Sequence, residues 1–404
     1  MTATRSAWRR PPAWLGISAV DCAAHNMNSL GPFAVNALMD GRHLDALQAG
    51  IWTMVEILSY AAAMLAMAPV AGRVRLRPLA LLAAAIASAA QAGSALTGSY
   101  AVLLSLRVAS GLGLGGLNAV VNIASARSPS PQRTLSLVMV AQTVVFSAAG
   151  LVLPLAGQVG GQAGIFGALA LLIVAMMPAM TLLPATVPAV SADPGAAGAR
   201  VVAPSAGAVR GRAALVLAAV ALYTGGSLAV WPFTVHIGQS VGLGGGAFGR
   251  LTVAANMLGL AFCLLGVALG ERPAAARLLL PALGITGVAC VVQAHPPGAA
   301  LFVAAFLCNF ALWFMIYPGL IAMTCRIDSS GRLATAASGI WMVSQALTTT
   351  LAGYCGRNGQ FLTVGIGSLV ACILAAGFLA VFASCRVHST REAGEGRDVP
   401  PAIH

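Results

Sequence analysis

Charged side chains are scarce in this chain of 404 residues. Asp, Glu, Lys and Arg together make up only 8% of it, lysine is absent, and all 22 basic residues are arginine. So few charges exclude a soluble protein of this length, whose surface needs many more. Residues 134–192 and 278–325 contain no charge at all. Because a membrane-spanning helix needs about 20 mostly apolar residues, each stretch has room for two spans and a turn. The composition predicts a polytopic, all-α membrane protein.

Sequence patterns typical of enzymes and metalloproteins are missing as well. There is no C-x-x-C or H-x-x-x-H pair to hold a metal, no P-loop to bind ATP, and no nucleophile motif in a plausible setting. Gly111, Gly113 and Gly116 satisfy the dinucleotide pattern G-x-G-x-x-G, but that pattern requires a preceding strand, and here the glycines lie inside an apolar span. We therefore expect no enzyme, no metal and no cofactor, and take the proton gradient as the energy source.

The arginines indicate how the chain is inserted. With a cytoplasmic N-terminus, eighteen of them fall in or beside cytoplasmic segments, whereas Arg42, Arg250 and Arg357 fall outside and Arg107 lies within a span. This bias follows the positive-inside rule. It predicts a multi-pass protein of the bacterial inner membrane with both termini in the cytoplasm. The net charge of +12 is thereby explained by topology, and we expect a lipid bilayer and no nucleic acid as partner.

Breaks at glycine, proline and charge divide the chain into twelve predicted transmembrane helices. A connection over 184–212, rich in Pro, Gly, Ala and Arg, is typical of a flexible linker. It separates a predicted six-helix bundle over 1–183 from a second over 213–385, and residues 386–404 are expected to form a cytoplasmic tail. The predicted spans are 14–38, 46–69, 78–97, 100–125, 134–157, 163–183, 213–237, 248–270, 277–294, 299–325, 334–355 and 360–384.

The two predicted halves resemble each other in sequence. The stretch "MVAQTVVFSAAG" from Met139 aligns with "MVSQALTTTLAG" from Met342, matching Met, Val, Gln and the last Gly. Because each half has an even number of spans, the repeats enter the membrane in the same orientation, as in the parallel repeats of some transporters. A shift of 200 residues aligns further positions, namely Pro32 with Pro232, Phe33 with Phe233, and Glu56 with Asn256.

The chain resembles a twelve-helix transporter of the major facilitator superfamily over nearly its whole length. Proton-coupled exporters of that family carry L-x-x-x-R-x-x-Q-G-x-G in the fourth span. Leu103, Arg107, Gly111 and Gly113 match this pattern, and Ser110 replaces the Gln. The resemblance implies two parallel six-helix bundles, with spans one, four, seven and ten around a central cavity.

Two other family patterns are kept only in part. In the fifth-span element G-P-x-x-G-G, Pro154 and Gly157 fit, but Leu153 and Gln158 stand in place of glycines. The loop after the second span keeps its glycine and arginines over 72–77 but has lost the usual acid. The resemblance implies a monomeric proton antiporter that exports a small organic molecule, such as a drug, an aromatic metabolite or a siderophore-like compound. A proton symporter that imports a small organic solute is the alternative, and a transporter-shaped membrane sensor is a further one.

Three ionisable residues lie within the predicted spans of the first half: Asp21, Glu56 and Arg107. Each costs about 3 kcal/mol at the bilayer centre, so each is expected to face the protein interior and have a partner. Helical spacing predicts three faces around these residues. They are Asp21, His25 and Asn28; Thr53, Glu56 and Tyr60; and Arg107, Gly111, Gly115, Asn118 and Asn122.

These charges are the predicted proton-coupling site. Burial favours a protonated carboxyl, whereas a nearby guanidinium favours the carboxylate. If Arg107 moves as the bundles rock, protonation of Glu56 or Asp21 changes with it. We expect Glu56 to be the partner of Arg107, with Asp21 and His25 as a second proton-accessible pair. The alternative is a buried ion pair that only fixes helix packing.

Aromatic and amide side chains within the spans are the predicted substrate contacts, because such walls suit a partly apolar organic solute. The alternative for the aromatic residues is the interfacial belt of membrane proteins, which fits Trp313 poorly because it lies within a span. The predicted substrate-binding residues are Asn28, Asn118, Asn122, Gln142, Tyr223, Trp231, Asn256, Asn309, Trp313, Tyr317 and Gln345.

Overall fold

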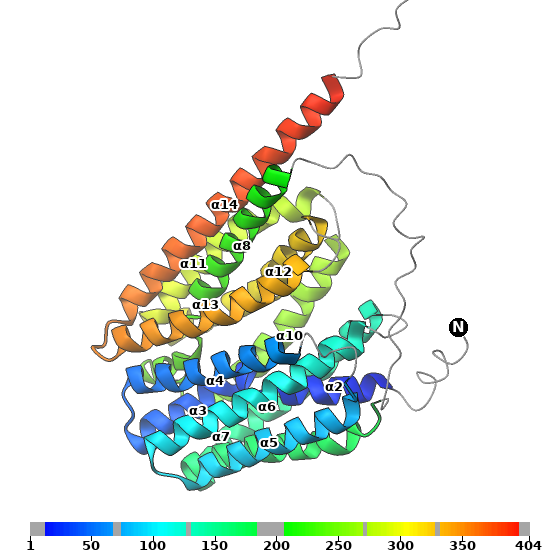
Figure 1. Cartoon of the computed structure of the whole chain (residues 1–404). Coiled ribbons are helices and arrows are strands. Elements are labelled where there is room, and N and C mark those ends of the chain that lie inside the picture. Colours follow the sequence, from blue (N-terminus) through cyan, green and yellow to red (C-terminus); the bar gives the residue numbers. More distant parts are fainter. Residues whose placement is uncertain are drawn as a thin grey trace, which may run out of the picture.

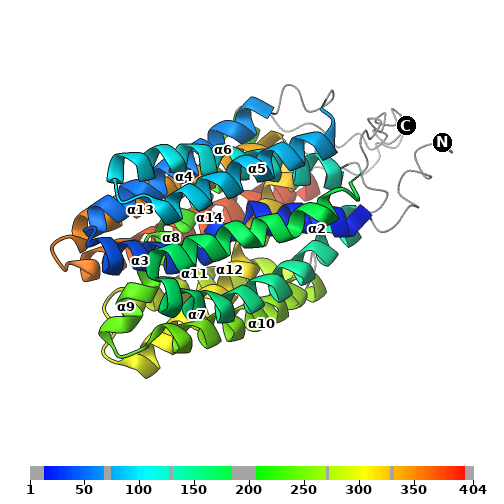
Figure 2. The same ribbon diagram turned by 90° about the horizontal axis from the view of Figure 1, so that it is seen from below.

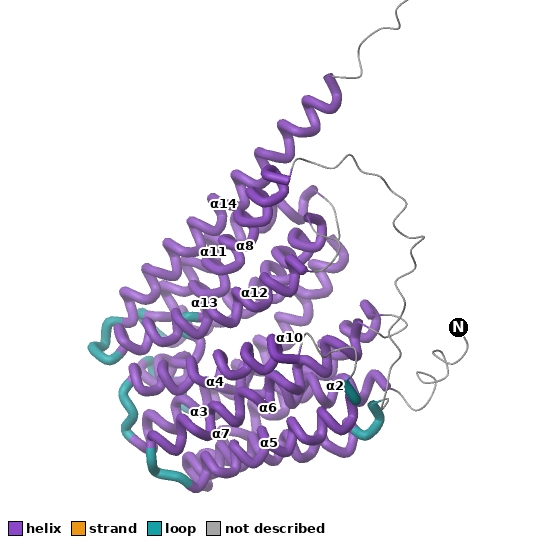
Figure 3. Tube along the Cα trace, viewed as in Figure 1, coloured by secondary structure: helices purple, strands orange, loops and turns teal. Residues whose placement is uncertain are grey.

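The computed structural model describes residues 13–67, 74–126, 131–183, 206–269, 273–327 and 332–395. Helices account for nearly all of these residues, and the described part of the chain contains no strand (Figure 3). The all-α fold class is thereby confirmed. Residues 184–205 of the predicted linker and residues 396–404 of the predicted tail lie outside the described residues.

Two bundles of helices lie one above the other in Figure 1. The lower bundle consists of α2 (Ala13–Ala24), α3 (Asn26–Arg42), α4 (Ala46–Met67), α5 (Leu76–Leu96), α6 (Tyr100–Ala126) and α7 (Pro131–Met180). The upper bundle consists of α8 (Ala206–Leu228), η3 (Trp231–Phe233), α9 (Thr234–Ser240), α10 (Gly245–Leu269), α11 (Pro273–Ala294), α12 (Ala299–Ile327), α13 (Arg332–Gly356) and α14 (Phe361–Glu395).

Within the described residues, each of the twelve predicted spans overlaps a helix, but the boundaries differ from the prediction in several places. The predicted first span is divided at His25 into α2 and α3. The element α7 contains two predicted spans, and the chain turns between them at Gly161, inside the predicted gap, with φ 53°, a left-handed conformation that favours glycine. Helix α8 begins seven residues before the predicted 213, and α14 continues to Glu395, inside the predicted tail. Eight helices of the described chain are long and apolar enough to cross a membrane, so the count of twelve stays a prediction.

Glycine allows the central helices of the lower bundle to pack at close range. A Cβ at Gly111 or Gly115 of α6 would collide with the backbone of α4 at Glu56 and Tyr60. On another side of α6, a Cβ at Gly113 would lie 2.7 Å from the carbonyl oxygen of Ala83 in α5. Small residues at helix contacts are typical of membrane proteins. The glycine ladder is therefore a packing surface, and it places Arg107 between α4 and α5.

The outer surface of both bundles is apolar. Leucine side chains stay largely exposed on it, as at Leu65 and Leu171 (both 66%), Leu264 (62%) and Leu351 (63%). A soluble monomer rarely exposes so many large apolar side chains, which mark a surface in contact with membrane or protein. This surface agrees with the prediction of a protein that sits in a lipid bilayer.

The two bundles contact each other through glycines near one end of the molecule, here called the closed end. This end carries the connections 43–45, 97–99 and 357–360 on the left of Figure 3. At Gly50 of α4, a Cβ would lie 2.9 Å from the carbonyl oxygen of Thr349 in α13, and at Gly353 of α13 it would collide with Ala46. The α4·α13 crossing therefore tolerates only glycine at these points.

A second crossing, between α7 and α10, repeats this arrangement (Figure 2). A Cβ at Gly249 of α10 would collide with the carbonyl oxygen of Gly150 in α7. Gly150 is the last residue of the repeat that begins at Met139, and Gly353 is its counterpart in the second repeat. The internal repeat of the sequence thus supplies one close crossing at each side of the contact between the bundles.

Two polar pairs add to the contact between the bundles. Arg357 Nε lies 3.3 Å from Asp45 Oδ2. Gln239 Nε2 donates to Asp40 Oδ2 at 3.2 Å. These pairs lie at or next to the connections of the closed end, while the bundles diverge towards the right of Figure 1. The arrangement is that of two bundles held together at one end.

Candidate functional site

The buried charges of the lower bundle form an ion pair between α4 and α6. Arg107 Nη1 donates to Glu56 Oε2 at 2.9 Å. Arg107 is fully buried and Glu56 is 5% exposed. A buried charge without a partner is strongly destabilising, so the two residues depend on each other. The predicted partnership of Glu56 with Arg107 is what the structure shows.

The ion pair belongs to a ring of hydrogen bonds that also includes α5. Ser110 Oγ donates to Glu56 Oε1 at 2.6 Å and accepts from Gln91 Nε2 at 3.1 Å. Gln91 Oε1 in turn accepts from Arg107 Nη2 at 2.8 Å, and Ser94 Oγ lies 3.3 Å from the same nitrogen. The ring therefore runs through Arg107, Glu56, Ser110 and Gln91. Both carboxylate oxygens of Glu56 accept a hydrogen bond within it.

Two aromatic rings cover the guanidinium of Arg107. Its central carbon lies 4.1 Å from the ring centroid of Trp52 and 5.4 Å from that of Phe166. The two rings meet edge to face, with their centroids 5.9 Å apart. A cation on an aromatic face is stabilised by the ring quadrupole, most strongly when water is excluded. Arg107 thus keeps several partners besides the carboxylate.

Asp21 and His25 form the second predicted pair, where α2 meets α3. His25 Nδ1 lies 3.2 Å from Asp21 Oδ1 and at the same distance from the Asp21 carbonyl oxygen. The Asp21 side chain is buried, and its Oδ2 has no hydrogen-bond partner among the described residues. The His25 side chain is 20% exposed. The pair is close enough to share a proton, and that role stays a prediction.

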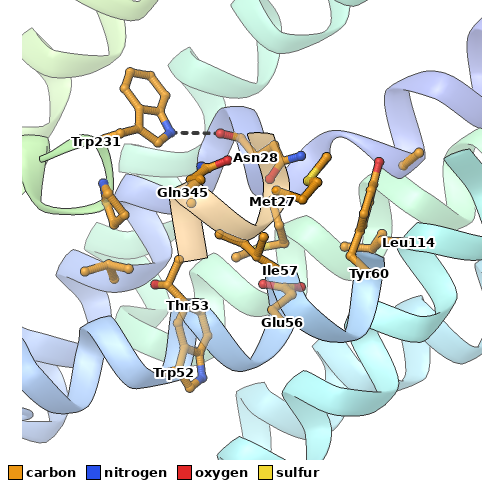
Figure 4. Close-up of a pocket in the computed structure, with 15 residues that line it drawn as sticks. Met27, Asn28, Trp52, Thr53, Glu56, Ile57, Tyr60, Leu114, Trp231 and Gln345 are labelled. Carbon is orange, nitrogen blue, oxygen red and sulfur yellow. Dashed lines mark hydrogen bonds between the residues drawn. The ribbon is translucent and has the colours of Figure 1, made fainter. Parts of the chain in front are cut away.

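A cavity lies between the two bundles, with one of the buried acids in its wall. Glu56 lines it, together with Thr53 and Tyr60 from the same predicted face of α4 (Figure 4). The upper bundle contributes Trp231 and Gln345. The remaining residues of the wall are Ala24, Met27, Asn28, Gly31, Val35, Trp52, Ile57, Leu114, Pro232 and Met342.

Three of the predicted substrate-binding residues lie on this wall: Asn28, Trp231 and Gln345. Trp231 Nε1 donates to the carbonyl oxygen of Asn28 at 2.8 Å, the hydrogen bond drawn in Figure 4. This bond joins α3 of the lower bundle to η3 of the upper one. Trp231 also stacks on Phe306 at 5.9 Å between centroids. The structure therefore holds the indole firmly at the junction of the bundles.

Other predicted aromatic contacts gather in a separate cluster within the upper bundle. Trp313 stacks on Tyr317 at 5.1 Å and on Tyr223 at 5.6 Å between ring centroids. Trp341 packs against both Trp313 and Tyr317, at 5.7 and 4.8 Å. None of these rings lines the described cavity. The contact of Trp313 or Tyr317 with substrate stays a prediction.

The remaining predicted amides also lie away from the cavity wall. Asn309 donates to Gln293 Oε1 at 3.1 Å and joins α12 to α11. Asn118 donates to Met64 Sδ at 3.3 Å and joins α6 to α4. Asn122 is exposed, Gln142 is half-buried, and Asn256 is buried with no partner for its Nδ2 among the described residues. Asn309 and Asn118 each join two helices of one bundle, and the substrate contact of these five amides stays a prediction.

Several residues of the site were not predicted. Gln91 and Ser94 complete the hydrogen bonds around Arg107. The sequence feature that could have predicted them is their spacing, because two polar residues at i and i+3 lie on one face of an Ala-rich span. Trp52 and Met342 look like ordinary core residues in the sequence. Within the described ranges, no group of three or more His, Cys, Asp or Glu is placed to hold a metal ion.

Comparisons with known proteins agree with this geometry. The family model of the Major Facilitator Superfamily matches residues 18–353, and the chain belongs to that family. A search of curated proteins finds no significant match to the sequence.

Solved structures of transporters share the fold at low sequence identity. The nucleoside transporter NupG superposes with a TM-score of 0.68 at 12% identity, covering 95% of this chain and 99% of that one. A D-xylose-proton symporter gives 0.65 at 13%, covering 91% and 95%. An auto inhibited peptide transporter of the POT family gives 0.70 at 13%, covering 93% and 97%. The protein is thus a multi-pass membrane transporter of the major facilitator type.

Proposed function

We propose that this transporter is a proton-coupled carrier of a small organic molecule, in which Glu56 binds the transported proton. The observation that carries the proposal is the double position of Glu56. Its carboxylate pairs with Arg107, and its side chain also lines the cavity between the bundles. Protonation of this one group therefore changes both a buried ion pair and the wall of the binding space.

The hydrogen-bond ring is suited to either protonation state of Glu56. When Glu56 is charged, Arg107 and Ser110 supply its hydrogen bonds. When Glu56 is neutral, Arg107 still has Gln91, Ser94 and the face of Trp52 as partners. A serine hydroxyl can both donate and accept, so Ser110 can accept from the protonated acid. Neither state leaves the arginine without partners.

The same helix connects the proton site to the contact between the bundles. Glu56 lies on α4, less than two helical turns from Gly50, where α4 crosses α13 at the closed end. A shift of α4 on protonation therefore acts on the α4·α13 crossing. With the cytoplasmic termini that the arginines predict, the closed end faces outward, and the structure represents an inward-facing state. Alternating access is then the opening of this end and the closing of the other.

Export by proton antiport is the direction we favour. Its support is the fourth-span pattern of the family's proton-coupled exporters, in which Leu103, Arg107, Gly111 and Gly113 match. The residue that replaces the family's Gln, Ser110, still bonds to the proton-binding acid.

Import by proton symport is the second candidate. The fifth-span element leans towards export, since Pro154 and Gly157 fit it, but Leu153 and Gln158 in place of glycines leave the direction open. A D-xylose-proton symporter with the same fold shows that this architecture also serves symport. A membrane sensor has no observation in its favour.

Transport by the purified full-length protein in liposomes tests the proposal. The liposomes contain a mixture of small aromatic and amide-bearing compounds, and a pH gradient is imposed in either direction. Mass spectrometry then measures which compounds move. Antiport predicts movement of a compound against the proton flow, and symport predicts movement with it. If no compound responds to the gradient in either direction, proton coupling is contradicted.

A further inference from the structure

Two amide groups with unused hydrogen-bonding capacity lie on the cavity wall, one from each bundle. Asn28 Nδ2 on α3 and Gln345 Oε1 on α13 are buried and have no hydrogen-bond partner among the described residues. Gln345 is only 4% exposed. Figure 4 shows the two amides beside each other, next to the indole of Trp231. An unpaired buried polar atom is costly, so these two atoms indicate a ligand that supplies both partners.

The charge on the wall is already neutralised. Both oxygens of Glu56 accept hydrogen bonds, one of them from Arg107 in an ion pair. The Thr53 hydroxyl donates to the carbonyl oxygen of Ala49 at 3.0 Å. A charged ligand would lose its hydration without gaining an opposite charge that is free to pair with it, which is unfavourable in a buried site. The wall therefore selects an uncharged ligand.

Much of the remaining wall is apolar, and it also contains the Tyr60 hydroxyl and Trp52 Nε1, which are buried without a partner among the described residues. Met27, Ile57, Leu114 and Met342 line the same cavity as the amides, and Trp231 offers an indole fixed by its bond to the Asn28 carbonyl oxygen. Methionine side chains adapt to irregular shapes and make favourable contacts with aromatic rings. Such a wall suits a planar apolar body that carries a small polar group.

Building on the proposed function, we propose that the transported solute is an uncharged, planar molecule that carries a lactam or carboxamide group. Its carbonyl oxygen accepts from Asn28 Nδ2, and its N–H donates to Gln345 Oε1. Asn28 and Gln345 belong to different bundles, so one small polar group bridges the two halves of the protein. The ligand is thereby bound at the junction that moves during transport.

Four bicyclic probes of nearly equal size test the proposal by equilibrium dialysis against the full-length protein in lipid nanodiscs. They are quinolin-2(1H)-one, its N-methyl derivative, the N-methylquinolinium cation and quinoline-2-carboxylate. The lactam supplies both partners, whereas methylation removes its N–H and leaves Gln345 unpaired. We expect the lactam to bind at least about tenfold more tightly than the other three, as the loss of one buried hydrogen bond predicts.

A substitution tests whether Gln345 is the residue that distinguishes the lactam from its N-methyl derivative. In Gln345→Leu, the lactam and its N-methyl derivative are expected to bind equally, while Gln360→Leu, an exposed amide outside the cavity, keeps the preference. The comparison of the four probes uses the unmodified protein and does not depend on the folding of a variant. Equal binding of the lactam and its N-methyl derivative, preference for either ion, or no binding of any probe overturns the proposal. Proton coupling is tested separately, with the compounds that the liposome experiment identifies.

Discussion

The guanidinium of Arg107 rests on the indole of Trp52, 4.1 Å from the guanidinium carbon to the ring centroid. Trp52 lies on α4, one turn before Glu56, and also lines the cavity, so one helix supplies both the carboxylate and the aromatic face that contact the buried cation. We expect Trp52→Leu to destabilise the protein by about 3 kcal/mol, from lost aromatic burial and from the lost cation–π contact. Trp52→Phe keeps a ring and should lose less. Thermal unfolding in detergent measures both variants, and equal midpoints for the two would contradict the stacking role.

Removing the guanidinium leaves a buried carboxylate without its partner. We expect Arg107→Ala to lower the free energy of unfolding by about 3–5 kcal/mol and to abolish proton-driven transport. Arg107→Lys keeps the positive charge but loses the planar fork that reaches both Glu56 and Gln91, so it should retain part of the activity. Transport in liposomes separates the two, and full activity in both would remove Arg107 from the mechanism.

The ring of hydrogen bonds gives Gln91 a specific role. Gln91→Leu leaves Arg107 Nη2 and Ser110 without a common partner, which costs about 1–3 kcal/mol for buried polar groups. Ser105→Ala serves as the matched control, because Ser105 is exposed on α6 and bonds only to the backbone of its own helix. The expected result is a lower unfolding midpoint for Gln91→Leu alone. A control that loses as much stability would show that the effect is not specific to the ring.

The closed end depends on glycine. Gly353→Leu places a side chain where even a Cβ collides with Ala46 of α4, so the α4·α13 crossing should open. Spin labels at positions 40 and 239, in a cysteine-free background, measure the separation of the bundles there. We expect the distance to increase in Gly353→Leu and to stay unchanged in Gly167→Leu, since a Cβ at Gly167 meets no atom within 4 Å. An unchanged distance in both variants would contradict the role of the crossing.

Much of the fold follows from the sequence because charge and apolar length report directly on the bilayer. Long stretches without charged residues predicted the membrane spans. Glu56 and Arg107, which are charged residues inside those spans, pair with each other because neither is stable alone in an apolar interior. The face of Thr53, Glu56 and Tyr60 also lines the cavity as helical spacing predicts.

Packing between helices was harder to predict. Spacing along one helix does not say which neighbour covers a face. It did not show that Trp313 and Tyr317 stack on each other away from the described cavity, and their contact with substrate stays a prediction. The break at His25 was missed, because the first span was predicted as one continuous helix. The turn at Gly161 falls in the gap predicted between 157 and 163. Local sequence fixes helix boundaries only to within a few residues. Gln91 completes the hydrogen-bond ring, but it was not predicted because its span contains no charged residue near it.

The central claim is that Glu56 binds the proton that drives transport. Proton movement into liposomes, followed with an internal pH-sensitive dye during transport of the compound that the mass-spectrometric experiment identifies, tests it most directly. The account predicts that Glu56→Gln exchanges this compound across the membrane but moves no protons and cannot concentrate it. Asp40→Asn, which replaces an exposed carboxylate at the closed end, should move protons like the unmodified protein. Proton-coupled accumulation by Glu56→Gln at the normal rate would contradict the account.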